Sequence, residues 1–138
     1  MILVDTGPFV ALFDPKDDAH TEARRILAGV GEPMVTTAPV LTEAFHLLDP
    51  GSQGAAALRT FLQRDGVGVW FFDRDSLERA LVLMERYADH PMDFADASLV
   101  TAAEQLRVTR IFTLDRNDFS TYRARIGRSQ RGFSILAP

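Results

Sequence analysis

Four acidic residues, far apart in the chain, each stand where an α/β protein presents a carboxylate at one edge of its sheet. Asp5 follows Ile2–Val4, an apolar run whose length is typical of a strand buried on both faces. Asp115 follows a second such run, and Glu43 and Asp96 fall in the first turns of expected helices. Carboxylate oxygens are the ligands that Mg²⁺ and Mn²⁺ prefer, so these residues raise the hypothesis of metal-assisted chemistry.

The expected positions explain how these acids would meet. In a parallel sheet the carboxyl ends of neighbouring strands lie at one rim, and the helices that follow begin at that same rim. Four carboxylates gathered there without a cation would repel one another and raise some of their pKa values. A divalent cation would turn the same side chains into ligands.

Each acid also has a simpler explanation. Asp96 stands three residues after Asp93, so a variant capping box would account for both. Asp115 lies in a turn-like segment, where Asp and Asn are common. Glu43 is more informative, because its helical neighbours are apolar and an acid on such a helix needs a partner. The joint pattern is therefore stronger evidence than any single residue.

Length and composition limit the class of protein. The 138 residues, 46% hydrophobic and 25% charged, are typical of a soluble globular protein, and we expect residues 1–138 to form a single domain. The absence of cysteine excludes disulfides, thiolate metal sites and cysteine nucleophiles. No apolar run approaches the roughly 20 residues of a membrane helix, and signal-peptide features are lacking. These features predict a cytoplasmic protein with no membrane association.

Charge is unevenly distributed along the chain. The net charge is −4, yet residues 107–138 carry seven arginines and only two acidic side chains. An acidic protein is a poor candidate for general binding to phosphate backbones, which relies on Lys and Arg. The arginines from Arg116 onward would nevertheless form a basic strip beside an acidic site, with a plain solvated surface as the alternative.

Short apolar runs alternate with helical periodicity along the whole chain. Strands are expected at 2–4, 33–36, 67–72, 110–114 and 133–136, and helices at 8–13, 20–27, 39–48, 55–64, 76–89 and 94–106, with a turn or short helix at 118–123. Thr37, Ser76 and Asp93 are the expected helix starts. This order predicts one α/β domain, with a mostly parallel sheet of four to five strands and helices on both faces.

Several short motifs occur in a recognisable order. They are Ile2–Gly7, Asp18–His20 with Ala23, Glu43, Asp93–Val100, and Ile111–Asp115 leading to Asp118–Phe119. Together they span nearly the whole chain and resemble the PIN-domain family, specifically its small VapC-type toxin ribonucleases. The resemblance implies a PIN-like fold and endonucleolytic cleavage of RNA by water activated by Mg²⁺ or Mn²⁺, leaving a 3′-hydroxyl and a 5′-phosphate.

The resemblance also implies site residues and partners. A homodimer and an antitoxin protein that blocks the site are expected, with growth arrest as the biological role. Asp118 is an alternative to Asp115 as the fourth acid, and the hydroxyl of Thr113 would hold water or an acid in place. The implied catalytic and metal-holding acids are Asp5, Glu43, Asp96 and Asp115, with Asp93 as a further metal ligand and Thr6, Thr113 and Asp118 as auxiliary residues.

Other classes fit the residues less well. A phosphatase of the aspartyl-phosphate type needs a second acid two residues after the first, where this chain has Gly7. A receiver domain needs a lysine late in the chain, and the only lysine is Lys16. The remaining alternative is a PIN-like domain that binds RNA or protein without useful turnover. The three scattered histidines, His20, His46 and His90, are expected to have surface or packing roles.

Overall fold

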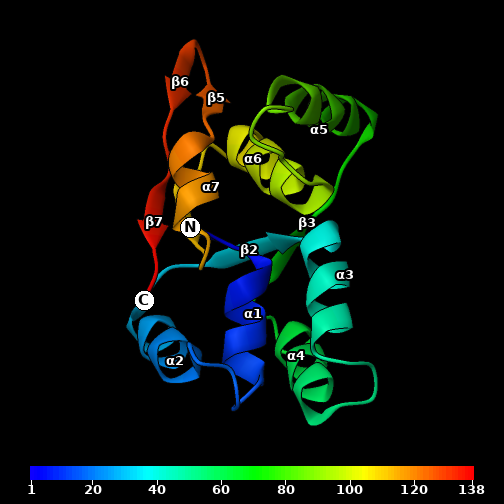
Figure 1. Cartoon of the computed structure of the whole chain (residues 1–138), viewed down its shortest axis with the longest axis vertical. Coiled ribbons are helices and arrows are strands. Elements are labelled where there is room, and N and C mark those ends of the chain that lie inside the picture. The colour runs from blue at the N-terminus through cyan, green and yellow to red at the C-terminus, as the bar shows by residue number, and fades with distance from the viewer.

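The structure, a computed structural model, describes all 138 residues, and its main element is a parallel five-stranded sheet with the order β3-β2-β1-β4-β7 (Figure 1). The strands are β1 (Ile2–Val4), β2 (Met34–Thr37), β3 (Gly68–Trp70), β4 (Arg110–Phe112), β5 (Ala124–Ile126), β6 (Ser129–Arg131) and β7 (Ser134–Leu136). The helices are α1 (Thr6–Phe13), α2 (His20–Gly29), α3 (Ala38–Leu47), α4 (Gln53–Gln63), α5 (Arg74–Arg86), α6 (Phe94–Leu106) and α7 (Arg116–Thr121). The predicted α/β class is confirmed.

The central strand is β1, which pairs in parallel with β2 on one side and with β4 on the other. Leu3 lies opposite Val35 and Ile111 in these two ladders. All three residues of β1 are buried, as a continuous apolar strand covered on both faces requires. The residue that follows β1, Asp5, is therefore placed at the middle of the sheet's carboxyl rim.

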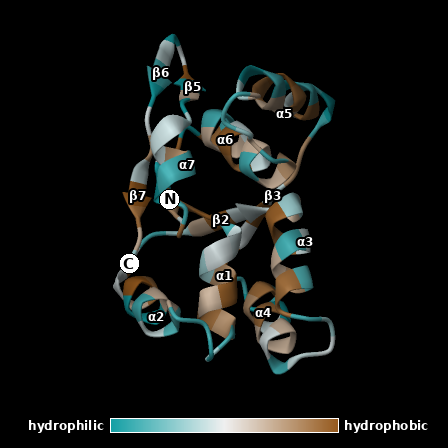
Figure 2. Ribbon diagram, viewed as in Figure 1, coloured by the Kyte–Doolittle hydropathy of each residue, from teal (hydrophilic) through white to brown (hydrophobic).

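Helices cover both faces of the sheet. Figure 1 shows α5 and α6 on one side of the sheet and α1, α2 and α4 on the other. Hydrophobic colours in Figure 2 mark β7 and much of α4, whereas β6 is hydrophilic and α5 alternates between hydrophilic and hydrophobic residues, as an amphipathic surface helix does. No helix combines the length and apolar character that crossing a membrane would require.

Element boundaries differ from the prediction where side chains decide them. Asp73, not Ser76, begins α5: its Oδ1 accepts from the Ser76 N–H at 2.8 Å, and the Ser76 hydroxyl accepts from the Asp73 N–H at 2.9 Å. This reciprocal capping moves the start of the helix upstream. The helix also ends at Arg86, short of the expected end near His90. Strand β4 ends at Phe112, so the residues up to Asp115 form its exit rather than the strand itself.

The antiparallel hairpin of β5 and β6 was not predicted. Its strands have three residues each, too few for an alternating pattern to stand out. Ala124 and Ile126 are buried while Arg125 between them is exposed, and Gly127 turns the chain with a φ of 61°. The arginines of residues 125–131 therefore lie on a hairpin, in a stretch for which no element was predicted.

The contact between α1 and α4 depends on a glycine. A Cβ added to Gly54 would lie 2.7 Å from the backbone oxygen of Phe13, which cannot turn aside as a side chain can. We expect Gly54→Ala to lower the free energy of unfolding by about 1–3 kcal/mol, as overpacked sites do. Urea denaturation would measure the change. The control is Gly29→Ala, where a Cβ meets nothing within 4 Å and the higher helix propensity of alanine predicts equal or greater stability.

Candidate active site

Asp5 is fixed from two directions. Its Oδ1 accepts from the Thr6 N–H at 2.7 Å, which caps α1, and its Oδ2 accepts from the Thr113 hydroxyl at 2.8 Å. Thr113 also accepts from the Asp115 N–H at 2.9 Å, so one hydroxyl connects the exits of β1 and β4. Thr113, expected as a hydroxyl that holds water or an acid in place, thus contacts the Asp5 carboxylate directly. The Asp5 side chain is consequently held in one orientation, with only 8% of the residue exposed.

Asp93 and Asp96 have different roles at the start of α6. Asp93 caps the helix, because its Oδ1 accepts from the Asp96 N–H at 2.8 Å. The Asp96 carboxylate does not return to the cap, and it accepts instead from the Tyr122 hydroxyl at 2.9 Å. Capping therefore accounts for Asp93, as predicted, but it does not account for the side chain of Asp96.

Glu43 projects from the second turn of α3 and makes no hydrogen bond or ion pair with another protein group. Its helix begins at Thr37, whose hydroxyl caps the Val40 N–H, as predicted. The same hydroxyl lies 2.6 Å from the hydroxyl of Ser98, within α6. Because this buried contact joins α3 to α6, it fixes the helix that carries Glu43 against the helix that carries Asp96.

Asp115 and Asp118 stand at the start of α7. Asp115 caps this helix by accepting from the Asp118 N–H at 3.0 Å, so turn chemistry explains part of its role. The Asp118 Oδ1 lies 2.6 Å from the Nε2 of His90. Both acids face the same cleft, and the structure leaves either one available as the fourth carboxylate.

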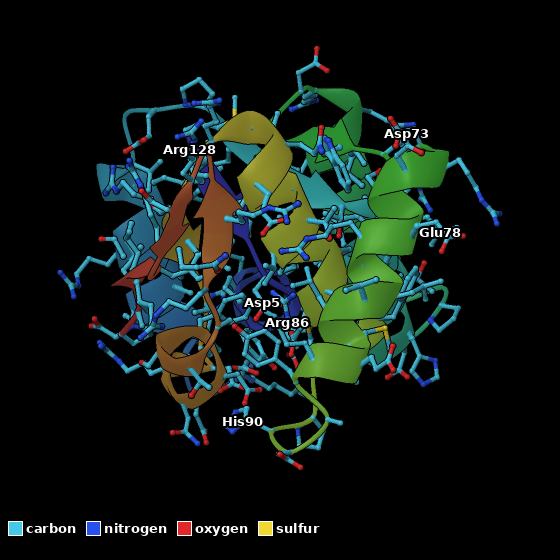
Figure 3. All side chains as sticks on the ribbon, turned by 90° about the horizontal axis from the view of Figure 1, so that it is seen from above. Asp5, Asp73, Glu78, Arg86, His90 and Arg128 are labelled. Carbon is cyan, nitrogen blue, oxygen red and sulfur yellow. The ribbon has the colours of Figure 1, made fainter.

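The predicted acids line one cleft at the carboxyl rim of the sheet, with a volume of about 410 Å³. Figure 3 shows Asp5 near the middle of the molecule and His90 at its edge, on the loop that follows α5. The cleft has no lysine, arginine or histidine in its lining. Its lining residues are Asp5, Thr6, Gly7, Glu43, Leu47, Asp93, Asp96, Leu114, Asp115 and Asp118.

This concentration of carboxylates raises proton affinities. Burial raises the pKa of Asp5 to about 6, with a further contribution from the charges of Glu43 and Asp93, although the hydrogen bonds from Thr113 and Thr6 oppose it. Burial and the neighbouring charges of Asp93 and Asp5 raise the pKa of Asp96 to about 8. Ionisation of these carboxylates therefore lowers the stability of the metal-free fold, and a bound cation would remove this destabilisation.

The chemistry of the cleft fits a hard divalent cation. All of its candidate ligands are oxygens, the donors that Mg²⁺ and Mn²⁺ take. Thr6 lines the cleft, and its hydroxyl is the one buried side-chain polar atom without a hydrogen-bond partner, so it is free to bind a water of a hydrated ion. No three His, Asp or Glu side chains stand as a ready-made set of metal ligands.

Three residues at the site were missed or discounted. Tyr122 is fully buried and bonds Asp96, and a buried tyrosine needs such a partner for its hydroxyl. Ser98 holds α3 to α6. His90 was expected to have only a surface or packing role, but it contacts Asp118 and lies edge-on to Tyr122, with ring centroids 6.0 Å apart. His20 does pack one helix on another, with its Nδ1 2.7 Å from the Ala11 carbonyl.

The arginines of the proposed basic strip have different roles in the structure. The Arg123 guanidinium donates to the carbonyls of Ser120, Thr121 and Tyr122 at 2.8, 3.2 and 2.9 Å, so it closes the end of α7. Arg125, Arg128 and Arg131 are exposed on the β5–β6 hairpin, and none of them forms a salt bridge. These three arginines therefore place positive charge on the hairpin that projects beside α6 (Figure 1). Arg116, at the start of α7, lies apart from them and donates to the Pro138 carbonyl at 3.3 Å.

The fold and the site together define the class of protein. It is an α/β protein whose parallel sheet carries an acidic cleft at its carboxyl rim. The chain belongs to the PIN domain family, whose family model matches residues 2–124. Ribonuclease VapC26 of Mycobacterium tuberculosis (strain ATCC 25618 / H37Rv) is 26% identical over 125 residues, which cover 88% of this chain and 92% of that protein.

Solved structures give the same result. The crystal structure of Mycobacterium tuberculosis VapC20, described as a sarcin–ricin loop cleaving toxin, superposes with a TM-score of 0.78 at 25% identity and covers 85% of this chain and 92% of that one. A chain of a toxin–antitoxin complex from Klebsiella pneumoniae has a TM-score of 0.68 at 19% identity, covering 88% of this chain and 92% of that one. The latter likeness supports the fold alone.

Proposed function

We propose that this protein is a Mg²⁺- or Mn²⁺-dependent endoribonuclease, the toxin of a type II toxin–antitoxin system, acting in the cytoplasm. The observation that carries the proposal is a cleft with six carboxylates and no basic side chain in its lining. Such a cleft repels a phosphate backbone until a cation is bound, so its negative charge is consistent with metal-assisted hydrolysis of a phosphodiester. The name ribonuclease for the relative VapC26 and the description of VapC20 as a sarcin–ricin loop cleaving toxin agree with this proposal.

The residues of the cleft divide the work. Asp5, Glu43 and Asp96 would hold the cation, with Asp93 and either Asp115 or Asp118 beside them. A divalent cation there supplies Lewis-acid activation of the phosphate and of the attacking water. Hydrogen bonds from Thr113 to Asp5 and from Tyr122 to Asp96 fix two of these acids, which keeps their ligand oxygens oriented before substrate arrives.

An antitoxin partner and a homodimer belong to the same proposal. The structural neighbour from Klebsiella pneumoniae was solved as a toxin–antitoxin complex, and we propose a comparable protein inhibitor for this chain. Toxicity of an uninhibited ribonuclease provides the reason for such a partner. The competing function is a PIN domain that binds RNA or protein without turnover, which keeps the fold but not the cleavage.

The test is cleavage of end-labelled RNAs by purified protein with Mg²⁺, with Mn²⁺ or with EDTA. We expect fragments with 5′-phosphates in either metal and none in EDTA, with activity restored when metal is added back. Cleavage that persists in EDTA would contradict the metal proposal. RNA binding without fragments in any metal would favour the competing function.

A further inference from the structure

A second hollow, of about 610 Å³, opens beside the acidic cleft. The two share Glu43 and Asp93, so they form one continuous surface. We call this second feature the aromatic hollow and define it by Pro39 and His46 of α3, by Phe72, and by Phe94 at the start of α6. Its lining comes from α3, from the start of α6 and from Phe72, which follows β3. Figure 1 shows the end of β3 between these two helices.

Aromatic rings form one wall of the hollow. Phe72 and Phe94 stack with ring centroids 5.4 Å apart and an interplanar angle of 27°. Trp70 supports Phe72 from behind in an edge-on contact at 5.2 Å. Phe94 is nonetheless 37% exposed, and it directly follows the capping residue Asp93. The protein thus holds a rigid, partly uncovered ring beside its acidic site.

The lining also disfavours anionic ligands. It contains no lysine or arginine, and its two charged members are the carboxylates shared with the cleft, so a phosphate is not attracted to it. A nucleobase is planar and neutral, and stacking of a base on an aromatic side chain contributes about 1–3 kcal/mol. The exposed His46 of α3, also in the lining, offers ring nitrogens to the edge of a base.

We propose that the aromatic hollow binds one unpaired nucleobase, next to the phosphate that is cut. The proposal rests on the proposed function, because a phosphate at Glu43 and Asp93 places the neighbouring nucleotide beside Phe94. A base inside an A-form helix stays stacked in its strand and cannot enter. The hollow therefore selects RNA that is single-stranded at the cleavage position, as in a loop or a bulge, and its stacking energy contributes to substrate choice.

Abasic substitution of the RNA tests this inference. Each nucleotide flanking the mapped cut is replaced in turn by an abasic one, and cleavage is compared between the wild type, Phe94→Ala and Phe94→Leu. We expect one abasic position to raise the KM of the wild type about tenfold, which corresponds to about 1.4 kcal/mol. The same position should add little for Phe94→Ala, because the ring and the base form one contact, and paired losses of one contact are not additive.

Phe71→Leu is the matched control. Phe71 directly precedes Phe72 in the chain and is 68% exposed. It lines a different groove and not the aromatic hollow. We expect this variant to keep the full sensitivity to the abasic substitution. Thermal unfolding of each variant checks that the fold is retained, and Phe94→Leu keeps an apolar side chain if the alanine variant unfolds.

The outcomes separate this inference from the proposed function. A protein that cleaves no RNA in any metal refutes the proposed function, and the base subsite with it. A protein that cleaves intact and abasic RNA equally well refutes the subsite alone, as does an abasic effect that is undiminished in both Phe94 variants. A lower mass of Phe94→Leu in sedimentation, without a change in RNA selectivity, would show that the hollow is an interface between copies of the chain.

Discussion

RNA cleavage by the Asp5→Asn variant is expected to fall by about 10³-fold or more, with the fold intact. Asp5 leaves the central strand, and it is the most buried of the acids in the cleft. A neutral amide at this position binds a divalent cation weakly, so several kcal/mol of transition-state stabilisation would be lost. The assay is single-turnover cleavage in saturating Mg²⁺, so that a loss in substrate affinity does not obscure the loss in rate.

The fold should survive because asparagine keeps the shape and the local bonds. The amide oxygen of the asparagine can still accept from the Thr6 N–H. In the wild type the Thr113 hydroxyl donates to Asp5, whereas in the variant the amide nitrogen would donate to that hydroxyl. The variant also removes a charge whose burial raises the pKa of Asp5 to about 6. Metal-free Asp5→Asn should therefore unfold at a higher temperature than the wild type at pH 8.

The matched control is Asp75→Asn, which removes one carboxylate from the exposed first turn of α5, outside the cleft. It should leave both the cleavage rate and the unfolding temperature nearly unchanged. Wild-type rates in Asp5→Asn would exclude this carboxylate from metal binding. Loss of activity together with loss of the folded state would make the effect one of stability, and the expectation of an intact fold would then be wrong.

Local signals in the sequence were sufficient for the sheet and for the acids at its rim. An apolar run followed by an acid, as at Ile2–Val4 and Asp5, fixes both the strand and the place where the carboxylate emerges. Thr37 and Asp93 were also recognisable as caps, because capping depends only on the next few residues. These features need no knowledge of which segments pack together.

Contacts between distant segments could not be predicted in the same way. The bond from Tyr122 to Asp96 spans 26 positions, and that between Thr37 and Ser98 spans 61. Nothing near Tyr122 indicates its partner, because only the tertiary fold brings the residue after α7 to the start of α6. The division of labour between Asp93 and Asp96 was hidden for the same reason, since both residues satisfy a capping pattern until the tyrosine is placed.

The metal-free protein is expected to lose stability as the pH rises from about 4 to above 8. Asp5 and Asp96 have folded-state pKa values of about 6 and about 8, both raised from an ordinary value of 3.8. Below pH 4 both are protonated whether the chain is folded or not, so their full contribution to stability is present. Above that pH the unfolded chain ionises freely and the folded one does not, and the contribution is lost as the pH passes 6 and then 8.

The expected size of this loss is on the order of 2–4 kcal/mol, which discounts the full value of about 1.4 kcal/mol per pKa unit for water that enters the cleft. Urea denaturation in EDTA at pH 5, 7 and 9 measures it. Saturating Mg²⁺ should flatten the profile, because the cation binds the ionised carboxylates of the folded state and its binding energy adds to stability mainly at the higher pH values.

The variant Asp96→Asn separates the contribution of Asp96 to the pH dependence of stability from the contributions of all other titrating groups. Asparagine keeps an oxygen for the Tyr122 hydroxyl but cannot ionise, so the loss of stability between pH 6 and 8, which Asp96 alone contributes, should disappear. Between pH 4 and 6 both acids contribute, so there the slope should become smaller and keep only the part that Asp5 contributes. An unchanged slope in this variant would mean that Asp96 is already ionised in the metal-free fold. The acids would then be stabilised by something other than a cation, and the main electrostatic reason for placing metal in this cleft would be gone.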